Sequence, residues 1–445
     1  MSANYDVIFR GGTIVNHDGA GLADVAVRDG RIAAIGDLAQ SAAGETVDAT
    51  GLHILPGVID TQVHMREPGN EHKEDLASGS RAAVLGGVTG VFEMPNTSPP
   101  TTTVDALADK LARAHERMYC DFAFYLGATA ENADTLAEAE RAPGCCGIKI
   151  FMGSSTGTLL VPDDESLLRI LQNGHRRAAV HSEDENRLRE RRPLAETGKV
   201  ETHAVWRDSI AAIRSTERLV HLARKAGRRV HVLHISTAEE IDFLAAHKDI
   251  ASVEVTPQHL TLEAPACYEE LGTYAQMNPP IRDAQVRQRL WYGLAQGIVD
   301  VIGSDHAPHT REEKQQTYPK SPSGMPGVQT LVPIMLDHVN AGRLTLERFV
   351  DLTSHGPNRL FGLARKGRLA VGYDADLTLV DMKRRQTISD DWIASTCGWT
   401  PFAGREVHGW PVGTVVRGQR VMWQDEIIGS PQGEAMQFQE ALPLL

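Results

Sequence analysis

The chain has 445 residues, of which 42% are hydrophobic, so it can bury a large core in one big domain or in a barrel with a companion domain. Its formal net charge of −13 is spread without long acidic blocks, which argues against a general binder of nucleic acids or anionic membranes. We therefore expect localised sites for small molecules and other proteins.

The cysteine content and the N-terminus bear on the compartment. The number of cysteines is odd and none lies in a CxxC pair, which predicts reduced thiols in a cytoplasmic protein: Cys120, Cys145, Cys146, Cys267 and Cys397. The opening MSANYDVIFRGG lacks a basic region followed by an apolar core, and no run of about 18 apolar residues occurs. We expect neither secretion nor a membrane span.

The two ends of the chain show short strand patterns separated by tight turns. Apolar residues alternate with Gly, Asn and Asp in YDVIFRGG, TIVNHDG, DVAVRDGRIAAIGD and ETVDAT. Turn-rich strand patterns return after about residue 365, in GRLAVGYDADLTLVD and VGTVVRGQRVMW. We predict that segments 1–54 and 365–445 form one small composite β-sandwich domain.

Between residues 55 and 364 short apolar strands alternate with amphipathic helical patterns such as VDALADKLARAHERM, the rhythm of parallel β/α architecture. Eight strands are predicted over roughly 300 residues, which favours the α/β class and a (β/α)8 TIM barrel over an open sheet. They are HILPGVID, VTGVFEM, DFAFYLG, GIKIF, AAVHSE, VHVLHIS, ASVEVT and VDVIGSD.

Five polar side chains are predicted near the carboxyl ends of these strands, where barrel enzymes place their active sites: His64, Lys149, His181, His234 and Asp305. Each alone has a simple structural explanation, such as a hydrogen-bonded histidine or a capping aspartate. Together they predict a site. Neutral imidazoles and carboxylates suit zinc, whereas a lysine ammonium has no lone pair, so Lys149 fits only as a carbamate formed with carbon dioxide.

Polar and glycine-containing motifs are distributed along nearly the whole chain: YDVIFRGGTIVN, DTQVHMREPG, FEMPNTSP, GIKIFMG, HSEDE, VHVLHIST, EVTPQHL, MNPPIR, GSDHAPH and GYDADLTLVD. Together they resemble the amidohydrolase superfamily and, within it, the dihydroorotase family of cyclic amidohydrolases. The resemblance implies a metal-dependent barrel with a small β domain that reversibly opens a cyclic amide, namely dihydroorotate to N-carbamoyl-L-aspartate in pyrimidine biosynthesis.

The resemblance also implies roles for individual residues. One or two zinc ions would be held, the α metal by His64, Lys149 and Asp305, and the β metal by Lys149, His181 and His234. Asp305 would carry the proton between the attacking hydroxide and the leaving nitrogen. The substrate would be held by Arg66, Asn96, Asn278 and His309.

Other interpretations stay open at this point. Hydantoinases, dihydropyrimidinases and allantoinases use rings that need not carry the same carboxylate, and GIKIFMGSS resembles their sequences as well. Arg66 on its own fits a surface ion pair with Glu67 or Glu71. The chain also resembles non-catalytic partners of aspartate transcarbamoylase, although retention of the whole residue set favours an enzyme. We expect a homo-oligomer.

The stretch DTQVHMREPG departs from the family pattern, because Gln62 stands where the first histidine of a His-x-His pair is found. A glutamine oxygen is a weaker zinc ligand than imidazole. We therefore predict a weakened or empty α site beside an intact β site. Lesser candidates for contact with metal or substrate are His231, His259 and the loop SPSGMPGVQT.

Overall fold

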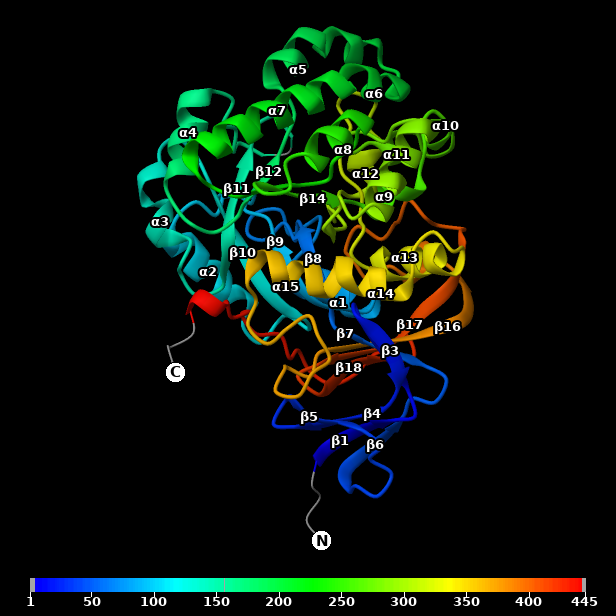
Figure 1. The fold of residues 1–445 in the computed structure, drawn as a ribbon. Helices are drawn as coiled ribbons and strands as arrows, with labels where there is room; N and C mark the ends of the chain where they lie inside the picture. The colour runs from blue at the N-terminus through cyan, green and yellow to red at the C-terminus, as the bar shows by residue number, and fades with distance from the viewer. Residues whose placement is uncertain (1–4, 156, 442–445) are drawn as a thin grey trace.

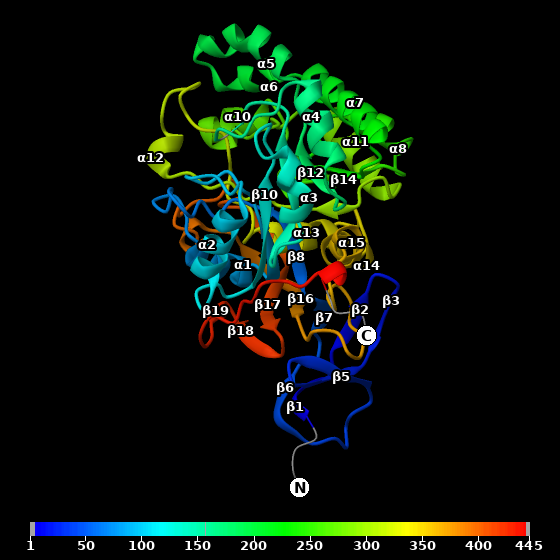
Figure 2. The same cartoon turned by 90° about the vertical axis from the view of Figure 1, so that its left-hand side faces the viewer.

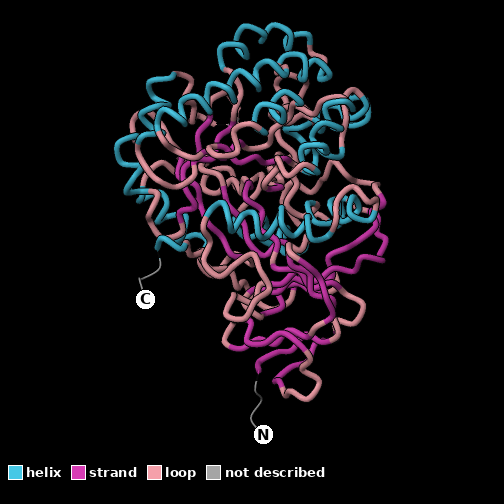
Figure 3. The backbone as a smooth tube through the Cα atoms, viewed as in Figure 1, coloured by secondary structure: helices cyan, strands magenta, loops and turns pink. Residues whose placement is uncertain are grey.

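The computed structural model describes residues 5–155 and 157–441. Its upper part is a barrel wrapped by helices, and its lower part consists of strands without helices (Figures 1 and 3). Eight parallel strands follow one another in chain order around the barrel: β8 (Val58–Val63), β9 (Val88–Glu93), β10 (Asp121–Gly127), β11 (Cys145–Phe151), β12 (Ala178–His181), β13 (Val230–Val232), β14 (Ala251–Val255) and β15 (Val301–Ile302).

The barrel is nearly closed. A bridge joins Val63 to His306, and the His64 N–H donates to the His306 carbonyl at 2.7 Å, which brings the chain after β15 against β8. All residues of these strands are buried, as parallel strands with both faces covered require. The predicted (β/α)8 barrel is confirmed.

Helices cover the outside of the barrel and its mouth. Asp75, Thr103 and Asp163 cap three of them by accepting a backbone N–H in the first turn. The helices are α1 (Leu76–Leu85), α2 (Val104–Ala114), α3 (Leu136–Ala139), α4 (Asp164–Gln172), α5 (Glu185–Arg191), α6 (His203–Trp206), α7 (Ser209–Ala226), α8 (Ala238–Ala245), α9 (Pro257–Thr261), α10 (Ala266–Leu271), α11 (Ala284–Ala295), α12 (Arg311–Lys314), α13 (Leu331–Asn340), α14 (Leu346–Val350) and α15 (Gly356–Phe361).

The two flanks of the chain meet in a separate β domain, as predicted. One sheet contains β1 (Tyr5–Arg10), β4 (Asp24–Arg28), β5 (Arg31–Gly36) and β6 (Ala43–Asp48). The other contains β2 (Thr13–Asn16), β3 (Gly19–Leu22), β7 (His53–Pro56), β16 (Leu377–Thr387), β17 (Glu406–Val416), β18 (Gln419–Trp423) and β19 (Glu426–Ile427). Phe9 of the first sheet and Leu377 of the second share one buried apolar cluster.

The stretch HILPGVID is divided between the two domains and is not a single barrel strand. Its first part is β7, which pairs antiparallel with β16, and the barrel strand β8 begins only at Val58. Gly57 lies at the junction, where a Cβ atom would approach Thr89 Oγ1 to 2.1 Å. Only glycine fits there, so the chain passes from one sheet to the other at this residue.

A segment near the C-terminus returns to the base of the barrel (Figure 2). Ala435 bridges to Phe122 at the start of β10, and Phe438 bridges to Leu363. The side chains of Met436 and Phe438 belong to a buried cluster with Phe92 of β9. Segment 432–438 therefore covers the end of the barrel opposite the carboxyl ends of its strands.

Two further features concern the expected compartment. All five cysteines are unpaired and buried, in agreement with the prediction of reduced thiols. Within residues 5–155 and 157–441, none of the helices has the length and apolar character needed to cross a membrane.

Candidate active site

One small cavity at the mouth of the barrel collects most of the predicted residues, each at or near the carboxyl end of a strand. Gln62 and His64 come from β8 and its end, Lys149 from β11 and His181 from β12, and Asp305 follows β15. The predicted residues that line the cavity are Gln62, His64, Arg66, Asn96, Lys149, His181, His234, Asn278 and Asp305.

Lys149 lies at the centre of this group. Its charge influences the pKa values of surrounding side chains from four different strands: His64, His181, His234 and Asp305. Its ammonium nitrogen lies 4.6 Å from the centre of the Phe151 ring. Burial lowers the pKa of Lys149 to about 7, so a large fraction of the amine is unprotonated near neutral pH.

His181 and His234, the His181–His234 pair, face each other across the cavity with their Nδ1 and Nε2 atoms 3.1 Å apart. Burial lowers the pKa of both rings, so both are neutral. The other nitrogen of His181, Nε2, lies 2.9 Å from Glu183 and donates its proton there. This contact leaves a lone pair on His181 Nδ1, directed into the site.

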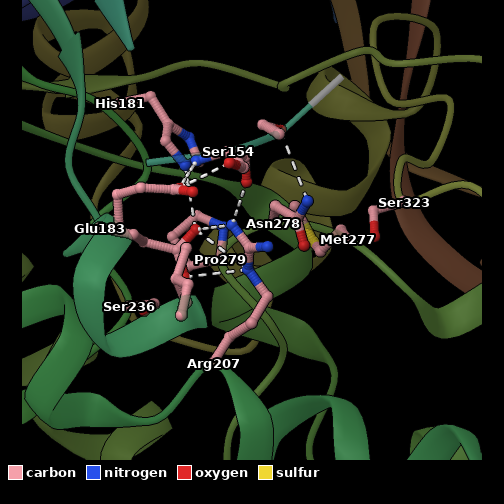
Figure 4. A network of polar contacts seen from close by, with 12 residues as sticks. Ser154, His181, Glu183, Arg207, Ser236, Met277, Asn278, Pro279 and Ser323 are labelled. Carbon is pink, nitrogen blue, oxygen red and sulfur yellow. Dashed lines mark hydrogen bonds and ion pairs between the residues drawn. The ribbon is translucent and has the colours of Figure 1, made fainter. Parts of the chain in front are cut away.

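Glu183 is itself held by the buried Arg207 (Figure 4). Arg207 Nε donates to the two carboxylate oxygens at 3.1 and 3.2 Å, and Arg207 Nη2 donates to the Ser154 carbonyl at 2.7 Å. Burial raises the pKa of Glu183, but Arg207 and His181 outweigh it and hold that pKa well below its usual range. Glu183 is therefore a permanent carboxylate that fixes the His181 ring.

Sequence reasoning missed these supporting residues. Glu183 lies in the motif HSEDE, two positions after His181. Side chains two positions apart in an extended chain point to the same side, so this spacing could have indicated that Glu183 lies next to His181. Arg207 is 24 positions further on and carried no such signal.

Asp305 is the centre of a second set of contacts, the Gln62–His64–Asp305 group. Gln62 Nε2 donates to Asp305 Oδ1 at 3.0 Å, and His64 Nε2 lies 3.3 Å from the same oxygen. His64 Nδ1 donates to Asn96 Oδ1 at 2.7 Å, which turns its other nitrogen toward Asp305. Burial raises the pKa of Asp305 to about 6, so this carboxylate can take up and release a proton near neutral pH.

Arg66 is only 3% exposed and lines the same cavity. Its Nε donates to the Pro308 carbonyl at 3.1 Å, and its Nη2 lies 3.3 Å from His309 Nε2. No ion pair joins it to a carboxylate of the described residues. Burial lowers the pKa of Arg66 to about 10, so it is still charged at neutral pH.

The surface ion pair considered for Arg66 is therefore wrong. Glu67 pairs instead with Arg117, whose Nη1 lies 2.7 Å from its Oε1. Glu71 accepts the backbone N–H of Gly69 at 2.9 Å. The positive φ of 62° at Arg66 breaks the strand direction immediately after β8, and the side chain then lies buried at the mouth.

The small cavity, about 20 Å³, adjoins an outer cavity of about 440 Å³, and the two share Ser155, Asn278 and Ser323. Asn278 Oδ1 accepts from His203 Nε2 at 3.0 Å, and its Nδ2 donates to Ser155 Oγ at 3.4 Å. The outer cavity reaches residues of α5 and α6 and thus offers a route to the residues that are predicted as metal ligands.

The lesser candidates are placed differently. Ser323 and Gly324 of the loop SPSGMPGVQT line the small cavity. His309, one of the predicted substrate residues, does not line the small cavity; its Nε2 lies 3.3 Å from Arg66 Nη2 and 3.1 Å from the Ser323 carbonyl. His231 bonds Ser252 Oγ at 2.8 Å, and His259 bonds the Pro279 carbonyl at 3.1 Å, so both rings are engaged outside the cavity.

The donor atoms fit a metal unequally. In the part of the chain that the structure describes, no three His, Cys, Asp or Glu side chains gather as a ligand cluster. Lys149 cannot count toward such a cluster, because lysine is not one of these four residue types. Gln62 cannot count either, since it stands where the family pattern has a histidine. The His181–His234 pair offers two neutral imidazole nitrogens that face each other, which suits a metal. In the Gln62–His64–Asp305 group an amide N–H points at the carboxylate instead.

Comparisons with known proteins agree with this architecture. Residues 53–421 match the Amidohydrolase family. A dihydroorotase of Halobacterium salinarum is 40% identical over 93% of this chain and 97% of its own length. An L-hydantoinase of Paenarthrobacter aurescens is 34% identical over 95% of this chain and 96% of its own length. The solved structure of L-hydantoinase from Arthrobacter aurescens superposes with a TM-score of 0.92 at 31% identity, covering 97% of this chain and 99% of that one.

The barrel, the composite β domain and the polar mouth thus define a hydrolase of the TIM-barrel class. The chain belongs to the amidohydrolase family.

Proposed function

We propose that this enzyme is a dihydroorotase, which interconverts dihydroorotate and N-carbamoyl-L-aspartate in pyrimidine biosynthesis. The observation that carries the proposal is the buried Arg66 guanidinium, which lines the cavity without a carboxylate partner among the described residues. A buried guanidinium without a carboxylate in direct contact is costly, and a carboxylate on the substrate would compensate it through a bidentate contact. Dihydroorotate has that carboxylate, whereas dihydrouracil and hydantoin lack it.

We propose zinc as the metal, since members of the family are generally metal-dependent. His181 and His234 would hold one ion together with Lys149 as a carbamate, and His64 and Asp305 would contribute to a weaker second position. When bound, zinc supplies a Lewis acid that polarises the ring carbonyl and lowers the pKa of water. The pKa of about 7 at Lys149 makes its unprotonated amine available to add carbon dioxide, with loss of one proton.

The chain's own residues supply orientation and proton transfer. Asp305 accepts a proton from the attacking water and passes it to the leaving ring nitrogen, and it works in the opposite sense during ring closure. Gln62 and His64 orient that carboxylate through their contacts at 3.0 and 3.3 Å. Arg66, supported by His309, fixes the substrate carboxylate, and Asn96 and Asn278 line the walls beside it.

The test compares substrates on metal-replete protein. We expect cyclisation of N-carbamoyl-aspartate and hydrolysis of dihydroorotate, and little action on hydantoin, dihydrouracil or allantoin. In Arg66→Met, kcat/KM for dihydroorotate should fall by about a hundredfold or more, as for loss of a buried charge contact. Turnover of hydantoin without turnover of dihydroorotate would instead favour a hydantoinase, the runner-up supported by the TM-score of 0.92.

Partners and compartment complete the proposal. We place the enzyme in the cytoplasm, on the basis of its five unpaired cysteines. We further propose a homo-oligomer that associates with aspartate transcarbamoylase. Size-exclusion chromatography of the enzyme alone and mixed with that transcarbamoylase tests both points, and a monomer that co-elutes with nothing would contradict them.

A further inference from the structure

The end of the barrel opposite the active site carries a second polar cavity of about 610 Å³. It is formed where the chain enters strands β12 to β15, together with residues of α14 and α15. Five basic side chains line it: Arg177, Arg229, Lys248, Arg348 and Arg359. Three carboxylates also line the cavity, so basic side chains outnumber acidic ones there although the protein as a whole has a net charge of −13.

Three of these basic residues have a carboxylate partner inside the cavity. Lys248 and Arg359 both pair with Asp300, the latter at 3.5 Å. Arg348 pairs with Asp351. The remaining lining carboxylate, Asp249, is bound from outside by Arg224 through two contacts of 2.7 and 2.8 Å. All three acidic groups of the cavity are thus already neutralised.

Arg177 and Arg229 have no carboxylate partner among residues 5–155 and 157–441. Arg177 is half-buried, its Nη1 donates to the Val230 carbonyl at 3.0 Å, and its Nε is buried without any hydrogen-bond partner. Burial and the neighbouring charge of Arg229 lower the pKa of Arg177 to about 10. The Asp300 carboxylate offsets part of this effect on Arg177, but neither guanidinium has a carboxylate in direct contact among the described residues, and a bound anion would contact both.

The surrounding cations are fixed in advance. Lys248 Nζ donates to the Ile298 carbonyl at 2.6 Å, and Arg348 Nη2 donates to the Val299 carbonyl at 2.6 Å. Anchoring of this kind lowers the entropy that a ligand must remove on binding. The volume lies in the range of small-molecule pockets, and the polar lining suits a highly charged ligand.

We propose that this cavity is a binding site for a phosphate-bearing small molecule, with Arg177 and Arg229 as its principal ligands. A guanidinium matches phosphate oxygens with a fork of two donors. The site is separate from the catalytic mouth, but Arg177 directly precedes β12, which ends at His181, and Arg229 directly precedes β13, after which His234 follows. A bound phosphate would join the bases of the two strands whose ends carry the His181–His234 pair.

Inorganic phosphate is the probe, titrated by calorimetry into the metal-replete enzyme at 0.15 M NaCl. We expect saturable binding that weakens at least tenfold in Arg229→Ala and in Arg177→Gln. The matched control is Arg169→Ala, which removes an exposed arginine that is paired with Asp134 and does not line the cavity; it should retain the affinity of the unaltered enzyme.

Thermal unfolding gives a second measurement on the same variants. Phosphate should raise the Tm of the unaltered enzyme and of Arg169→Ala, and should leave that of Arg229→Ala almost unchanged. Absence of saturable binding, or binding of equal strength in all variants, would overturn the proposal, the latter because it would place phosphate elsewhere. None of these results depends on which cyclic amide the enzyme hydrolyses.

Discussion

The His181–His234 pair and the Gln62–His64–Asp305 group occupy the same cavity but differ in their support. In the pair, His181 is fixed by Glu183, and Glu183 is fixed by the buried Arg207, so that the other ring nitrogen of His181 faces His234. In the group, the carboxylate of Asp305 already accepts an amide N–H from Gln62. In the pair two neutral ring nitrogens face each other, whereas in the group the carboxylate oxygen accepts an amide N–H.

From this difference we predict a metal site that is strong on one side of the cavity and weak on the other. Second-layer carboxylates raise the basicity of a histidine ligand and keep its ring in place. A glutamine at a ligand position can turn its amide group around and bond a neighbouring ligand instead. We therefore expect one tightly held ion at the His181–His234 pair and a weaker one at the Gln62–His64–Asp305 group.

The largest effect is expected from His234→Ala, which removes half of the His181–His234 pair. Activity should fall by about a thousandfold or more, and tightly bound metal should be lost, because one imidazole remains where two faced each other. Metal analysis and turnover measure this. The control His231→Gln alters a buried histidine of the same strand that bonds Ser252 and should keep its metal. Equal metal loss in both variants would mean a general disruption of the barrel.

Glu183→Gln should have an intermediate effect. It preserves the shape of the side chain but removes the charge that orients His181 and pairs with Arg207, so metal affinity should fall by roughly 10- to 100-fold. Competition with a chelator measures the affinity. Glu240→Gln, at a buried glutamate bonded to Thr216 and Thr237, should reduce stability without weakening the metal. An unchanged affinity in Glu183→Gln would show that His181 needs no support.

Gln62→His should produce the smallest change in metal binding, and it should strengthen binding where the other two variants weaken it. It replaces the amide that bonds Asp305 with an imidazole, so the second ion should bind several-fold more tightly or appear in the metal count. Titration with zinc followed by metal analysis is the measurement. Two equally tight ions in the unaltered protein would defeat the comparison between the two sides.

Much of the fold could be predicted because the barrel strands are short apolar runs, buried on both faces and separated by amphipathic helices. The division of HILPGVID could not be predicted, since it depends on the pairing of β7 with β16, a strand that lies far along the chain. The pairing of segment 432–438 with β10 could not be predicted either, because the sequence of a short extended segment does not indicate which strand it will contact.

The candidate site was similarly predictable in part. His64, Lys149, His181, His234 and Asp305 could be expected together because carboxyl ends of barrel strands converge. The environment of Arg66 could not be foreseen, because it depends on an ion pair between Glu67 and Arg117, two residues that lie 50 positions apart in the sequence. The same holds for the contact of Gln62 with Asp305, which joins the first and last barrel strands.

Segment 432–438 also has a consequence for the order of folding during synthesis. Its contacts with Phe122 and Leu363 cover apolar side chains at the base of the barrel, among them Phe92. β16 and β17, which complete the sheet containing β7, likewise come late in the chain. All eight barrel strands are therefore synthesised before the segment that covers their base. Until residue 438 has left the ribosome, apolar side chains at the base of the nascent barrel stay exposed to solvent.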